Sequence, residues 1–192
     1  MNTTFYRLLI CQIVTLFANA ALRFALPLYL LRKTGSAALY GGITAAALVP
    51  MLAGTLYGGI LADSCCKQTL LAVLNFITAL GLLAAAICFR QIPSTAVVLG
   101  TLCLLYAAEG LFQPAVQASL PLLLLGPALT QGNAAVQLAD TIDELLGSLL
   151  GSLLLQSVGL RTLLIFCAVC LAATALFFQA LPILQPTRQP PA

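Results

Sequence analysis

Charge is scarce in this sequence. Of the 192 residues, 7% are charged and 61% are hydrophobic. Soluble domains carry roughly 25% charged residues, so this chain has too few charges to cover a surface that faces water. The mean hydropathy of +1.08 leads to the same conclusion. The composition therefore excludes an ordinary soluble domain and indicates that a lipid bilayer surrounds most of the chain.

Histidine is absent altogether. Its absence removes the commonest general base and a common metal ligand. Cys167 and Cys170 form a C-x-x-C pair, but the pair lies inside an apolar run, where cysteine behaves as a small hydrophobic residue. The D-G-x-x-A-R motif of phospholipid synthases is missing too. We therefore expect no enzyme activity, no cofactor and no metal site.

The net charge of +3 is small and scattered along the chain, so nucleic acid is not an expected partner.

Six apolar segments are long enough to cross a bilayer, which takes about 20 residues. Their length and the lack of strict alternation favour helices over the strands of a barrel. A polar or turn-like break lies between each pair, the longest at 121–132. We expect one transmembrane domain over residues 1–182, followed by a disordered, proline-rich tail at 183–192. The expected helices lie at about 7–31, 37–61, 69–89, 95–120, 133–157 and 162–182.

Polar residues in the first, fourth and fifth segments recur at helical spacing, so they share one face of each helix. A charged side chain that faces hydrocarbon costs about 2.5–3.5 kcal/mol or more, so these faces should surround a common polar interior. They consist of Gln12, Asn19 and Arg23; Tyr106, Glu109, Gln113 and Gln117; and Asn133, Gln137, Asp140 and Glu144, flanked by Asp143.

Two interpretations of these charges stay open. Arg23 and Glu109 could form an ion pair on the path of a substrate or proton, or the same pair could simply hold the helices together. The acids of the fifth segment could belong to that path, or they could complement the positive end of a helix that begins at about 133. In the same segment, Gly147 and Gly151 form a G-x-x-x-G pattern that favours close packing of helices.

The junction after the second segment reads G-I-L-A-D-S-C-C-K from Gly59 to Lys67. It resembles motif A of the major facilitator superfamily, G-x-L-A-D-R-x-G-R/K, which joins helices two and three on the cytoplasmic side. The matching residues are Gly59, Leu61, Ala62, Asp63 and Lys67, whereas Ser64 and Cys66 replace the usual arginine and glycine.

Three further stretches resemble the efflux-type branch of that superfamily, which includes macrolide exporters. Residues 19–31 and 34–36 look like its first helix. Residues 112–115, 119–121 and 131–134 look like its passage from helix four to helix five, and residues 145–155 look like its glycine-rich fifth helix.

This resemblance implies an all-α membrane protein whose six helices form two inverted three-helix repeats, the N-terminal half of a major facilitator fold. It also implies proton-coupled efflux of small lipophilic molecules across a cell (inner) membrane, with both termini in the cytoplasm. In such a transporter the motif residues Gly59, Asp63 and Lys67 would gate the cytoplasmic end, and Glu109 would take the coupling proton. The cavity would be lined by Asn19, Arg23, Glu109, Gln113, Asp140 and Glu144.

The superfamily normally has two six-helix halves with the substrate site between them. The expected partners are therefore the lipid bilayer, a small-molecule substrate, and either a second copy of this chain or a separately encoded C-terminal half. The alternative is a truncated transporter remnant with no transport activity of its own.

Overall fold

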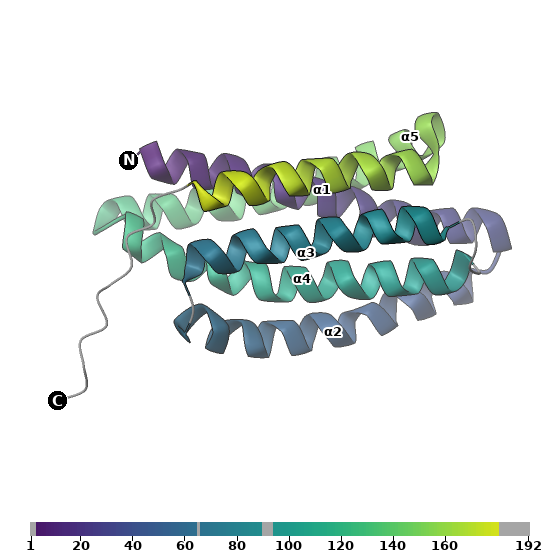
Figure 1. The fold of residues 1–192 in the computed structure, drawn as a ribbon, viewed down its shortest axis with the longest axis horizontal. Helices are drawn as coiled ribbons and strands as arrows, with labels where there is room; N and C mark the ends of the chain where they lie inside the picture. The colour runs from purple at the N-terminus through teal and green to yellow at the C-terminus, as the bar shows by residue number, and fades with distance from the viewer. Residues whose placement is uncertain (1–2, 65, 90–93, 181–192) are drawn as a thin grey trace.

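The structure is a computed structural model that describes residues 3–64, 66–89 and 94–180, apart from the side chains of Thr3 and Asp63. The tail at 183–192 lies outside the described residues, so its predicted disorder stays a prediction. The described residues form five helices, each long and apolar enough to cross a membrane (Figure 1). The helices are α1 (Thr3–Thr34), α2 (Ala37–Ser64), α3 (Lys67–Cys88), α4 (Ser94–Leu123) and α5 (Pro127–Gln179).

The helix α5 contains a reversal. Its 53 residues would extend about 80 Å as one straight helix, whereas the hydrocarbon core of a bilayer is about 30 Å thick. Gly159 interrupts it with φ 77° and ψ 162°, a conformation that glycine adopts far more readily than other residues. Figure 1 shows the chain turning back there towards the end where α1 begins. Residues 127–158 and 160–179 are therefore two arms of α5, and they replace the separate helices predicted at about 133–157 and 162–182.

The break predicted at 121–132 is wrong in extent, because α4 continues to Leu123 and α5 begins at Pro127. A proline suits the first turn of a helix, since its missing N–H has no partner to lose there. Asp140 is 13 residues beyond Pro127, more than three turns at 3.6 residues per turn. The acids of the first arm are therefore too deep in the helix to complement its positive end, which acts within the first turn.

Two helix interfaces depend on glycine. Gly147 and Gly151 in the first arm of α5 lie against Ala20 and Ala21 of α1. A Cβ atom at either glycine would collide with α1. These contacts let the backbones approach closely, as small residues do in membrane helices.

The second interface joins α2 to α4 in the same way. A Cβ atom at Gly54 would lie 2.8 Å from the carbonyl oxygen of Ala107, and one at Gly58 would lie 2.9 Å from that of Gly110. The helix α3 packs against both α4 and α5.

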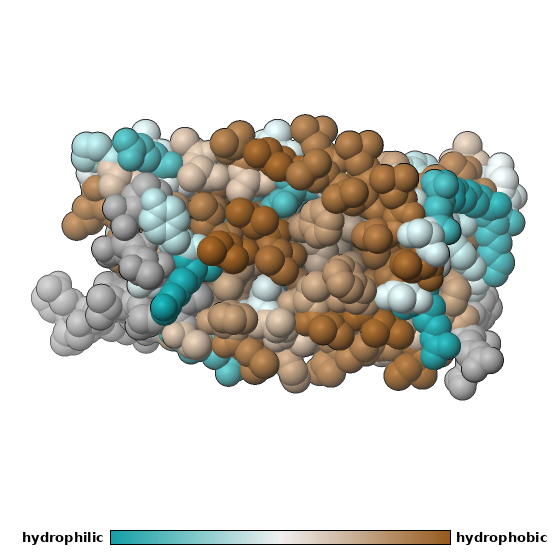
Figure 2. Space-filling model, turned by 90° about the horizontal axis from the view of Figure 1, so that it is seen from above, coloured by the Kyte–Doolittle hydropathy of each residue, from teal (hydrophilic) through white to brown (hydrophobic). Residues whose placement is uncertain are grey.

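The buried apolar residues fall into two clusters along the bundle. One includes Leu22, Leu105 and Leu171, and the other includes Leu8, Phe112 and Phe178. Most of the buried polar residues of α1, α3, α4 and α5 lie between the two clusters in sequence, among them Thr15, Asn75, Glu109 and Asp143. Outside, apolar side chains cover most of the visible face, and hydrophilic ones gather towards its two ends (Figure 2). This distribution is that of a multi-pass membrane protein with a polar interior.

Candidate functional site

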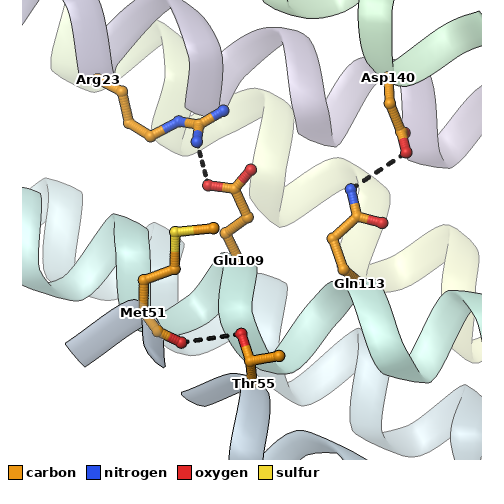
Figure 3. A network of polar contacts seen from close by, with 6 residues as sticks. All are labelled: Arg23, Met51, Thr55, Glu109, Gln113 and Asp140. Carbon is orange, nitrogen blue, oxygen red and sulfur yellow. Dashed lines mark hydrogen bonds and ion pairs between the residues drawn. The ribbon is translucent and has the colours of Figure 1, made fainter. Parts of the chain in front are cut away.

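An ion pair joins α1 to α4 inside the bundle. Arg23 donates a hydrogen bond from Nη1 to Oε2 of Glu109 (Figure 3). The two side chains are 15% and 10% exposed. The ring of Tyr106 lies 5.4 Å from the Cζ atom of Arg23, close enough for a cation–π interaction. The positive charge is therefore held by a carboxylate and an aromatic face that both come from α4.

Asp140 connects three helices. Its Oδ1 accepts a hydrogen bond of 2.9 Å from Nε2 of Gln12 in α1. Its Oδ2 accepts one of 3.3 Å from Nε2 of Gln113 in α4 (Figure 3). The second bond is longer than the usual range for N–H···O bonds and is therefore the weaker of the two. The polar faces of α1, α4 and the first arm of α5 thus meet at this carboxylate.

Several buried polar atoms at this meeting point have no hydrogen-bond partner among the described residues. They are Gln12 Oε1, Asn19 Oδ1, Arg23 Nε, Gln113 Oε1 and Asp143 Oδ2. Native proteins pair the large majority of buried polar atoms with protein groups or with ordered water. This concentration of unpaired atoms therefore marks a place suited to water or to a polar ligand.

Two cavities open beside these atoms. One of about 100 Å³ is lined by Leu16, Ala20, Arg23, Glu109, Gln113, Asp140, Asp143 and Glu144. The other, of about 160 Å³, is lined by Ala20, Arg23, Phe24, Tyr40, Thr44, Tyr106, Glu144 and Ser148. Both have room for water, but both are smaller than the 300–1,000 Å³ typical of pockets for drug-sized ligands. The described residues therefore form a polar wall rather than a complete substrate pocket.

The polar residues singled out in the sequence differ in their exposure and in whether they line a cavity. Arg23, Glu109, Gln113, Asp140 and Glu144 line one or both cavities. Asn19 is buried but is not part of either lining. The polar residues Gln117, Asn133 and Gln137 are exposed and also lie outside both linings.

The structure adds residues that the sequence did not single out as cavity residues. Asp143 is 4% exposed and faces the smaller cavity, whereas its neighbour Glu144 is exposed. Tyr40 and Thr44 of α2 line the larger cavity. Their spacing of four residues was a usable signal, because it places both side chains on one face of the helix.

The motif residues lie at the α2–α3 junction. Gly59 and Asp63 belong to the last turns of α2, and Lys67 is the first residue of α3. The helix α2 continues to Ser64 and α3 begins at Lys67, so both extend beyond the ends predicted at about 61 and 69. The side chain of Asp63 lies outside the described part of the chain, so the gating role of these residues stays a prediction.

A second polar cluster lies between α1, α3 and the second arm of α5. Asn75 donates from Nδ2 to the hydroxyl oxygens of Thr15 at 2.9 Å and Thr174 at 3.1 Å. Thr15 donates to Thr174 at 3.3 Å, and Thr174 donates to the carbonyl oxygen of Leu171 at 2.9 Å. All three side chains are buried and have partners, so this cluster acts as a structural tie.

The model of the Major Facilitator Superfamily matches residues 8–192. The chain belongs to the major facilitator superfamily. Its membership, together with the apolar helices, makes it a multi-pass membrane protein and a transporter of the major facilitator type. The predicted superfamily and the predicted all-helical membrane class are confirmed. Comparison with curated proteins gives no significant match.

Proposed function

We propose that this major facilitator protein exports small lipophilic molecules in exchange for protons, as the efflux-type resemblance implies. One observation carries the proposal: the Arg23–Glu109 ion pair stands in a largely buried polar interior that opens onto cavities and contains unpaired polar atoms. Charges are costly inside a membrane and are concentrated there on ion and substrate pathways.

Glu109 is the proposed proton carrier. Protonation would remove its negative charge and with it the attraction for Arg23, leaving the guanidinium free to take new partners. Because Arg23 belongs to α1 and Glu109 to α4, the number of bound protons would alter how strongly these helices attract each other. Proton binding would thereby change the shape of the cavity that Gln113, Asp140 and Glu144 also line.

The packing supports six membrane spans arranged as two inverted three-helix repeats. The two arms of α5 would supply the fifth and sixth spans. Gly151 lies against the carbonyl oxygen of Ala21, and Gly54 lies against that of Ala107. Ala21 precedes Arg23 by two residues, as Ala107 precedes Glu109. A two-fold axis relating α1 to α4, and α2 to the first arm of α5, would pass close to the ion pair.

A second six-helix unit would complete the cavity, supplied by another copy of this chain or by a separately encoded C-terminal half. The small volumes of the two cavities support this proposal. So do exposed apolar side chains on the two helices beside the polar wall, such as Leu52 and Leu56 in α2 and Leu145 and Leu149 in α5. Gly59, Asp63 and Lys67 would then gate the cytoplasmic end, in a cell (inner) membrane with both chain termini in the cytoplasm.

The test uses the full chain reconstituted in vesicles, with a macrolide and a fluorescent lipophilic dye as probes. We expect dye or drug movement against a proton gradient, together with proton flux that depends on the substrate. Glu109→Gln should abolish both, since the side chain keeps its shape but can no longer exchange a proton. Thr101→Val is the control, because that hydroxyl bonds only within α4, to the carbonyl oxygen of Val97, among described groups.

Size-exclusion chromatography with light scattering should accompany the transport assay. A discrete dimer would support a cavity built from two copies. Substrate-dependent flux that survives Glu109→Gln would disprove the role of Glu109. No flux from the folded protein, either alone or with a second half, would favour the alternative of a protein without transport of its own.

A further inference from the structure

A groove runs between the beginning of α1 and the end of α5, away from the polar interior. Its volume is about 600 Å³, within the 300–1,000 Å³ typical of ligand pockets. Its apolar walls include Ile10 and Val14 from α1 and Ala173 and Phe177 from α5, and Arg7 lies at its edge. Figure 1 shows these two segments side by side at the end marked N.

The hydroxyl group in the groove lining, that of Thr174, already has hydrogen-bond partners. Thr174, which lines the groove, accepts hydrogen bonds from Asn75 and Thr15 and donates its own to the carbonyl oxygen of Leu171. These bonds also tie both groove helices to α3. A polar ligand would find few free partners along such walls, whereas a hydrocarbon chain needs none.

The rims of the groove are apolar and exposed. Ile10 is 61% exposed and Phe177 is 66% exposed. In a protein that spans the membrane, exposed apolar side chains of this kind face the hydrocarbon of the lipids. The groove is therefore open to the acyl chains of the bilayer.

Arg7 places a positive charge at one end of the groove. Arg7 is exposed and forms no ion pair with any described residue. Gln68 donates from Nε2 to the carbonyl oxygen of Gln179, so the beginning of α3, with Lys67, lies at the same end of the bundle. Basic residues next to grooves between membrane helices attract anionic lipid head groups.

We propose that this groove binds one anionic membrane phospholipid, with an acyl chain between α1 and α5 and the phosphate on Arg7. The charge distribution favours a lipid over a second copy of the chain. The described carboxylate side chains, those of Glu109, Asp140, Asp143 and Glu144, line the smaller interior cavity, so none of these four is available on another copy to pair with Arg7. The site is separate from the proposed transport cavity.

Native mass spectrometry of the full chain tests the proposal, with phosphatidylglycerol and phosphatidylcholine of identical acyl chains as probes. We expect one phosphatidylglycerol to stay bound, with several-fold higher occupancy than phosphatidylcholine. Arg7→Gln should reduce phosphatidylglycerol to the phosphatidylcholine level, because the acyl chain still binds but the phosphate contact is lost. Arg161→Gln, at another exposed arginine, should leave the preference unchanged.

Filling the groove separates this site from ordinary lipid contact. Ala173→Phe should lower the occupancy of both lipids several-fold, whereas Val169→Phe, at a 61% exposed position outside the groove lining, should not. Equal losses in the two variants, or none, would overturn the proposal. The proposal would also be overturned if the unaltered protein is a dimer and Ala173→Phe makes it monomeric without loss of lipid. That result would mean that a second copy of the chain occupies the groove.

A second measurement does not depend on whether Ala173→Phe folds. Cys170 lines the groove as a free thiol in the unaltered chain. Phosphatidylglycerol should slow its alkylation by a maleimide several-fold more than phosphatidylcholine does. Alkylation at the same rate in both lipids would contradict the proposed site.

Discussion

Two polar clusters lie in the interior of this protein, and α1 contributes to both. In one, Thr15, Asn75 and Thr174 bond to one another, and their side chains are buried. In the other, Arg23, Glu109 and Asp140 have partners, but buried oxygens of Gln12, Asn19, Gln113 and Asp143 beside them find none in the described part of the chain. In the first cluster, Thr174 lines the apolar groove between α1 and α5, whereas the second cluster borders two cavities lined by charged side chains.

The two clusters show how buried polar groups that hold membrane helices together differ from buried polar groups that can serve transport. A closed set of hydrogen bonds lets helices α1, α3 and α5 associate without charge. An open set with excess acceptors is unfavourable unless water, a proton or a ligand completes it. We therefore expect changes in the first cluster to affect stability, and changes in the second to affect transport.

Exchanging the two charges should have the largest effect. In Arg23→Glu combined with Glu109→Arg, the ion pair can form again, but the carboxylate now belongs to α1. We expect transport to fall to background while most stability is retained. Glu109→Gln alone should cost about 1–3 kcal/mol, less than the roughly 3–5 kcal/mol of a fully buried broken pair, because this pair borders cavities with room for water. Recovered transport in the exchanged protein would show that the pair is only structural.

Asn75→Leu should have the next largest effect, on stability. It removes two hydrogen bonds between helices, each worth about 0.6 and at most about 1.7 kcal/mol in a membrane, so we expect a loss of about 1–3 kcal/mol. Thermal unfolding in detergent measures it. Thr78→Val is a suitable control, because that hydroxyl donates to the carbonyl oxygen of Leu74 in its own helix. The affinity of folded Asn75→Leu protein for its substrate should be unchanged. A changed affinity would show that the first cluster also contributes to transport.

The two amides that bind Asp140 offer a finer comparison. Gln12→Leu removes the bond of 2.9 Å, and Gln113→Leu removes the bond of 3.3 Å. We expect Gln12→Leu to cost about 0.6 kcal/mol and Gln113→Leu less than that, because the longer bond is weaker. Transport should respond in the opposite order, since Gln113 lines the smaller cavity and Gln12 does not. Unfolding and transport assays on the same preparations would detect a reversed ranking.

Asp143→Asn should have the smallest effect on stability. One of its carboxylate oxygens is buried without a partner among the residues that the structure describes. Replacing the charge with a neutral amide should therefore change stability by about 0–1 kcal/mol, in the stabilising direction. Asp140→Asn is the matched comparison, because Asp140 accepts two hydrogen bonds as a carboxylate. A destabilisation by Asp143→Asn larger than that by Asp140→Asn would indicate that Asp143 has a stabilising partner.

The membrane class and most of the polar wall could be predicted from the sequence. Scarce charge and long apolar runs leave lipid as the only medium in which this chain can bury its surface. The cost of charge in hydrocarbon then requires the polar faces of separate helices to meet. The wall that Arg23, Glu109, Gln113 and Asp140 form agrees with this requirement.

Other features depend on contacts between distant residues. Helical spacing places Asp143 at the edge of a stripe and Glu144 within it, but the close packing of Gly147 and Gly151 on α1 rotates the first arm of α5 so that Asp143 is buried and Glu144 exposed. Likewise, Asn75 looks like a minor exception in an apolar helix until α3 places it between Thr15 and Thr174.

By itself, then, the sequence determined that the chain spans a membrane and which helix faces are polar, because hydropathy and helical period act locally. The tertiary structure decided which polar atoms find partners and which stay open to the cavities. That outcome depends on the rotation and separation of packed helices, which are set by glycine contacts between residues far apart in the chain.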